Sequence, residues 1–85
     1  MYSFIMAENH TDFPAITICT ADGVIFPDIP KGDKTDLKQL APGSVRLEIY
    51  NNFMKQEAVV WVPVSPYSKA KLMVFADHIQ LIPLQ

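Results

Sequence analysis

The hydrophobic and polar positions of this 85-residue chain alternate with a period of two residues, which is the spacing of β-strands. The clearest example is 45–50, where Val45, Leu47 and Ile49 alternate with polar or amphipathic side chains. The segment 15–21 alternates in the same way. Further apolar segments rich in β-branched or aromatic residues predict strands over 24–26, 57–64, 71–75 and 78–82.

Turn-forming residues separate these segments. Asp22-Gly23 predicts a tight hairpin between the first two strands, because glycine accepts the positive φ that such a turn demands. Pro27 and Pro30 are expected to end the second strand, because proline cannot donate to a ladder. Pro63, within the apolar segment 57–64, argues for an edge strand, a bulge or a bend.

The connecting stretch 27–44 predicts one helical turn. Its middle runs from Thr35, a suitable N-cap, to Leu40, with Leu37 and Leu40 three positions apart and Pro42-Gly43 as a stop signal. The expected fold is therefore mainly all-β, a small five- to six-stranded OB-like or SH3-like barrel with one short helical turn.

Length and composition fit one small domain, 1–85, whose first twelve residues could form a separate N-terminal arm. Hydrophobic residues make up 49% of the chain and charged residues 19%. A domain of this size buries only about 63% of its unfolded surface. We therefore expect some apolar side chains to face a partner, most simply a second copy of the chain in a homodimer.

The cellular compartment of the protein is inferred from two features of the sequence. Cys19 is the only cysteine, which excludes a disulfide framework and favours a reducing cytoplasm. The chain has no apolar run long enough for a transmembrane helix, and its start lacks the basic segment of a signal peptide. A cytoplasmic protein without a membrane partner is the expectation.

The chain has few residues that could act as metal ligands or catalytic groups. His10 with Asp12 and Asp77 with His78 form two separate pairs, whereas zinc requires three or four convergent ligands. No metal or other cofactor is predicted. A small enzyme would need Cys19 to meet one of the two histidines, and an inert, partly buried thiol is the simpler interpretation. We therefore do not expect an enzyme.

A basic and aromatic patch is the alternative source of function. The net charge is −2, but residues 1–30 carry four acidic and no basic side chains, while 31–85 carry seven basic and five acidic ones. Single-stranded nucleic-acid binders combine basic side chains with aromatic rings on which bases stack. The corresponding candidates here are Arg46, Tyr50, Tyr67, Lys69 and Lys71, which would give weak, salt-sensitive binding.

The last part of the chain supports this alternative by resemblance. Leu72-Met73-Val74, followed by the segment 77–85, resembles the end of the filamentous-phage gene V single-stranded DNA-binding proteins, and Ala41-Pro42-Gly43 is similar to an Ala-Pro-Gly in that family. The resemblance implies a five-stranded OB-like barrel that dimerises. The chain lacks the family's basic N-terminal strand and its Gly-Lys-Pro-Tyr hairpin, so no binding residue is carried over.

Excess apolar surface favours a different function. The apolar side chains of 57–64 cannot all face one small core, and an apolar N-terminal arm can add a strand to a neighbouring sheet. The expected interface residues are Phe4, Val59, Trp61 and Val64. The preferred hypothesis is a non-enzymatic binding module that self-associates and occupies a protein surface, as adaptors, inhibitors and assembly factors of phages and mobile elements do.

Overall fold

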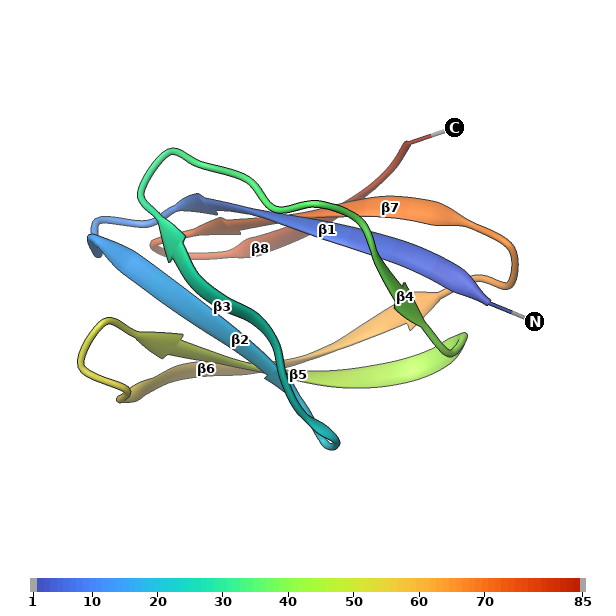
Figure 1. Cartoon of the computed structure of the whole chain (residues 1–85), viewed down its shortest axis with the longest axis horizontal. Coiled ribbons are helices and arrows are strands. Elements are labelled where there is room, and N and C mark those ends of the chain that lie inside the picture. Colours follow the sequence, from blue (N-terminus) through green and yellow to red (C-terminus); the bar gives the residue numbers. More distant parts are fainter. Residues whose placement is uncertain (1, 85) are drawn as a thin grey trace.

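The chain folds into eight β-strands in a computed structural model that describes residues 2–84 (Figure 1). The described part of the chain contains no helix, and thus no helix long and apolar enough to cross a membrane. The strands are β1 (Ser3–His10), β2 (Ala15–Thr20), β3 (Gly23–Pro30), β4 (Lys38–Leu40), β5 (Gly43–Asn51), β6 (Gln56–Val64), β7 (Lys69–Phe75) and β8 (Ile79–Pro83).

The strands form two four-stranded sheets that face each other. Sheet A has the order β4-β1-β7-β8, and sheet B has the order β3-β2-β5-β6. Figure 1 shows β1, β7 and β8 in one layer and β5 and β6 in the other. Neighbouring strands are antiparallel except for β1 and β7, which pair in parallel from Phe4 opposite Lys69 to His10 opposite Phe75.

The core lies between the sheets and follows from the alternation of side chains along each strand. In β1, buried and more exposed positions alternate from Ser3 to His10, and in β5 the buried positions are Leu47, Ile49 and Asn51. The buried apolar core comprises Ile5, Ala7, Ile16, Ile18, Phe26, Ile29, Leu47, Ile49, Val62, Val64, Leu72 and Val74.

Two sequence-based expectations for the N-terminal half are wrong. The helical turn between Thr35 and Leu40 is absent; Lys38–Leu40 instead forms β4, which pairs with the start of β1. Backbone pairing with the free edge of β1 is more favourable for this segment than the single helical turn that its residues weakly favour. The first residues are not a free arm either, because Ser3–His10 is an inner strand of sheet A.

All-β architecture is confirmed, whereas the structure shows two sheets rather than the predicted small barrel. The sequence predicted five to six strands, and the two that it missed are β1 and β4. Of the three interpretations of Pro63, an edge strand, a bulge or a bend, the edge strand agrees with the structure, since β6 lies at the edge of sheet B.

The second strand of the predicted hairpin passes Pro27 and ends at Pro30, the later of the two prolines that were expected to end it. β3 continues to Pro30 because two bulges let it pass Pro27 without a regular ladder: the register with β2 shifts between Ile18 and Cys19 and again between Ile16 and Ile18. Asp28 takes a positive φ of 46° in the second bulge, and its N–H donates to Thr17 Oγ1 at 3.1 Å.

Candidate functional site

The outer face of sheet B carries four of the nine candidate residues, Arg46, Tyr50, Val59 and Trp61. Successive strands place Val24, Cys19, Glu48 and Val59 in one row across the sheet, since each lies opposite the next. Trp61 lies opposite Arg46 in the neighbouring row. The face thus combines an apolar border on β6 with a polar centre on β5.

Alternation along β6 decides which side chains reach this face. Val62 and Val64 point into the core, with 6% and 8% exposed, whereas Val59 is 36% and Trp61 64% exposed. Trp61 is therefore not a core residue. The expectation that these apolar side chains cannot share one core is confirmed.

The four expected interface residues do not form one surface. Val59 and Trp61 lie together on the outer face of sheet B. Phe4 is exposed on β1 and belongs to the outer face of sheet A. Val64 is a core residue and is not accessible to a partner, because it lies at one of the alternating positions of β6 whose side chains point inward.

A hydrogen-bonded row runs along β5 at the centre of the sheet B face. Arg46 Nη1 and the Tyr50 hydroxyl donate to the two carboxylate oxygens of Glu48. The hydrogen bond from Tyr50, followed by that from Arg46, lowers the pKa of Glu48, and the same carboxylate raises the pKa of Tyr50. Arg46 thus has a carboxylate partner within its own chain.

The proposed nucleic-acid patch is divided between the two outer faces. Arg46 and Tyr50 lie on sheet B, whereas Lys69 and Lys71 lie on β7 of sheet A, and Tyr67 lies in the loop between β6 and β7. The outer faces of two packed sheets point in opposite directions, so these residues cannot line one groove. Sequence reasoning could not foresee this, because it assigned no strand to a sheet.

Cys19 does not meet either histidine. It lies on β2 in sheet B, while His10 ends β1 and His78 precedes β8, both in sheet A. Burial, with the nearby charge of Glu48, raises the pKa of the Cys19 thiol. Among the residues that the structure describes, no group of three or more His, Cys, Asp or Glu side chains is arranged to hold a metal ion.

The histidines belong instead to an aromatic stack that the sequence did not reveal. The ring of Phe75 lies between His10, at a centroid distance of 5.1 Å, and His78, at 4.5 Å. His10 Nε2 is 2.8 Å from Glu8 Oε1, and His78 Nδ1 is 2.6 Å from Asp77 Oδ1. The parallel pairing of β1 with β7 places His10 beside Phe75, and no local sequence pattern predicts that pairing.

Glu8 links this stack to the basic side chains of sheet A. Lys71 Nζ is 3.1 Å from Glu8 Oε2, so Glu8 lies between His10 and Lys71. The hydrogen bond with His10 is the main cause that lowers the pKa of Glu8. Lys71 lowers this pKa too, whereas partial burial raises it. Lys71, like Arg46, is therefore partnered within the chain.

Comparison with known proteins gives no relative: no family model, no curated protein and no solved structure matches the chain.

Proposed function

We propose that this protein is a non-enzymatic binding module that self-associates through β6 and acts by occupying a protein surface. The observation that carries the proposal is the edge strand β6, whose outer edge is unpaired and which presents Val59 and Trp61 to solvent. The proposed partner of this edge is β6 of a second copy of the chain.

The centre of β6 lacks the features with which natural edge strands avoid pairing. Between Glu57 and Pro63 it reads Ala-Val-Val-Trp-Val, five apolar residues without a charge. Edge strands are normally protected by lysine, proline, bulges or a covering segment. Pro63 protects one end of the β6 edge, and a bulge at the charged residue Glu57 protects the other end, which leaves the five apolar residues between them unprotected.

Antiparallel pairing of two β6 strands provides a specific arrangement. A twofold axis at Val60 would place Val59 of one copy opposite Trp61 of the other, twice per dimer. Cross-strand pairs of an aromatic and a β-branched side chain stabilise antiparallel sheets by about 0.2–1 kcal/mol each. Pro63 would then lie opposite Glu57, outside the paired centre.

Solution mass tests the proposal. Light scattering after gel filtration should give twice the 9.6 kDa of the chain. Trp61→Ala should reduce the mass to that of a monomer with an unchanged circular dichroism spectrum, because the side chain is exposed in the single copy. Phe53→Ala is the matched control, since Phe53 is an exposed aromatic in the turn before β6 and should leave the dimer intact.

Either of two results would contradict self-association through β6. One is a wild-type chain that stays monomeric at the highest concentration tested. The other is a Trp61→Ala variant that remains fully dimeric.

A weak single-stranded nucleic-acid binder is the second candidate, favoured by one end of sheet A. There Phe4 lies opposite Lys69, and the Phe4 N–H donates to the carbonyl of Ser68, beside the exposed ring of Tyr67. Oligothymidine should then bind with an affinity that falls steeply between about 50 and 200 mM salt. A self-associating module should show no shift with oligothymidine at either salt concentration.

A further inference from the structure

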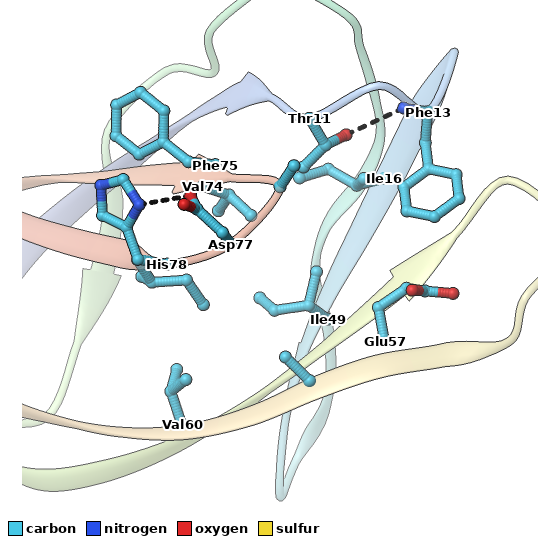
Figure 2. Close-up of a pocket in the computed structure, with 13 residues that line it drawn as sticks. Thr11, Phe13, Ile16, Ile49, Glu57, Val60, Val74, Phe75, Asp77 and His78 are labelled. Atoms are coloured by element: carbon cyan, nitrogen blue, oxygen red, sulfur yellow. Dashed lines mark hydrogen bonds and ion pairs between the residues drawn. The ribbon is translucent and has the colours of Figure 1, made fainter.

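A cavity of about 310 Å³ opens between the two sheets, at the end where β6 begins and β7 turns into β8 (Figure 2). Its floor is the core itself: Ile16, Ile49 and Val74 are each 1–2% exposed and point into it. The half-buried side chains of Val60 and Ile79 form the walls. The cavity therefore offers an apolar surface in contact with solvent.

Two features of the chain keep this space open. β6 and β8 are edge strands of different sheets, so no ladder joins them there. Ala58, which lies opposite Ile49, and Ala76, in the turn after β7, each contribute only a methyl group to the lining. A larger side chain at either position would occupy the cavity.

The mouth of the cavity is acidic. Glu57 and Asp77 line it, together with His78, and no lysine or arginine of the described residues does. Glu57 Oε2 accepts a hydrogen bond from Asn51 Nδ2 at 2.7 Å, and Asp77 Oδ1 is held by His78 Nδ1 at 2.6 Å. One oxygen of each carboxylate is thus fixed.

Aromatic rings complete the lining. Phe13 and Phe75 belong to it, and the His78 ring is stacked on Phe75. Both faces of the Phe75 ring are covered by His10 and His78, so a charged group would be held by the carboxylates of the mouth rather than by this ring. Carboxylates form their strongest hydrogen bonds with charged N–H donors. An anion would face two carboxylates without a compensating cation.

We propose that this cavity is a binding site for a small organic cation, with an apolar body seated on Ile49, Val60 and Val74 and its ammonium group beside Glu57, one of the two carboxylates that line the mouth. The volume lies at the lower end of the range of ligand sites, about 300–1,000 Å³, which limits the ligand to a compact molecule. The site uses inward-facing and mouth residues and none of the outer-face side chains Val59 and Trp61.

Three probes of equal chain length test the charge requirement. Hexylammonium, hexanol and hexanoate are titrated into the full chain, and binding is followed by NMR at the methyl groups of Ile49, Val60 and Val74. Hexylammonium should bind in the millimolar range that small ligands show, about tenfold tighter than hexanol, with hexanoate weakest.

Variants then assign the site. Glu57→Gln keeps an acceptor for Asn51 and should reduce the affinity for hexylammonium about tenfold, towards that for hexanol. Asp36→Asn removes an exposed carboxylate that does not line the cavity and should leave the affinity unchanged. Ala76→Leu, at a turn, and Ala58→Leu, in β6, should each abolish binding by filling the space. Using both keeps the test valid if one of them fails to fold.

Three results would overturn the proposal. Methyl signals that do not move with hexylammonium would exclude the site. Equal affinity for the three probes would show an apolar surface without selectivity for cations. Equal loss of affinity in Glu57→Gln and Asp36→Asn would show attraction to the net charge rather than to the mouth of the cavity.

Discussion

The side chain of Asn9 in β1 joins the two sheets, because its Nδ2 donates to the carbonyl of Ile29 in β3 at 2.9 Å. Its Oδ1 accepts from the N–H and the hydroxyl of Thr11, at 2.9 and 2.7 Å. Asn9 is fully buried, and each polar atom of its side chain has a partner. It therefore fixes the entry into the connection from β1 to β2.

Asn9→Ala should destabilise the fold by about 1–3 kcal/mol, because it leaves the Ile29 carbonyl and the Thr11 N–H without their partner in the interior. Urea unfolding followed by circular dichroism measures the loss. Asn52→Ala, in the exposed turn before β6, is the control and should change stability little. Equal stability of the two variants would show that water replaces the side chain of Asn9 without cost.

Acid should weaken the fold through Glu8. Its pKa in the folded chain lies below the ordinary value of 4.5, chiefly because of the hydrogen bond with His10 and then because of Lys71. A carboxyl whose pKa is lowered by folding stabilises the protein above its unfolded pKa, and this contribution is lost as the pH falls through the folded pKa. Melting temperatures measured from neutral pH down to about pH 2 should therefore decline below about pH 4.5.

Glu8→Gln isolates this contribution from that of the other carboxylates. The variant should melt below the wild type at neutral pH, and the two melting curves should converge as the pH falls below the folded pKa of Glu8. A constant difference between wild type and variant over the whole pH range would contradict the linkage.

Cys19 should react slowly with thiol reagents. Burial raises its pKa, with Glu48 acting in the same direction, and only the thiolate is nucleophilic. Iodoacetamide should alkylate the folded chain several-fold more slowly than free cysteine at the same pH, and the urea-unfolded chain at the rate of free cysteine. A folded-state rate equal to or above that of free cysteine would indicate an activated thiol.

The second bulge of β3 holds Asp28 at a φ of 46°, a conformation that costs a β-branched residue more than aspartate or glycine. Asp28→Gly should therefore leave stability nearly unchanged. Asp28→Val should reduce it by about 1–3 kcal/mol. Thermal unfolding of both variants measures the difference, and equal melting temperatures would mean that the bulge relaxes to accommodate valine.

Local signals predicted a large share of the fold. Alternation located β2 and β5, and apolar segments rich in β-branched or aromatic residues located β6, β7 and β8. The turn signal at Asp22-Gly23 located the hairpin between β2 and β3, with Thr20 opposite Gly23. These features depend on the alternation of side chains and on turn geometry, and both are determined by residues that are close together in the sequence. Val59 and Trp61 were expected at an interface together with Val64, which the alternation along β6 places in the core.

Features that depend on distant residues could not be predicted. Alternation in β1 was hidden among apolar residues, and its place between β4 and β7 depends on partners tens of residues away. The aromatic stack of His10, Phe75 and His78 follows from that pairing. The division of the basic patch has the same origin, since Arg46 and Lys71 belong to different sheets.

The parallel pairing of β1 with β7 also sets the order in which the chain can fold. Phe4 lies opposite Lys69, so β1 cannot pair with β7 until the ribosome has added the residues of β7, 65 positions later. At about 5–20 residues per second, β1 leaves the ribosome roughly 3–13 s before that neighbour. Meanwhile the β2–β3 hairpin and β5 with β6 can pair through short connections, whereas sheet A must close a long loop first. We therefore expect sheet B to form during synthesis and sheet A only after β7 has emerged, which leaves the apolar β1 exposed to chaperones or to a second nascent chain in the interval.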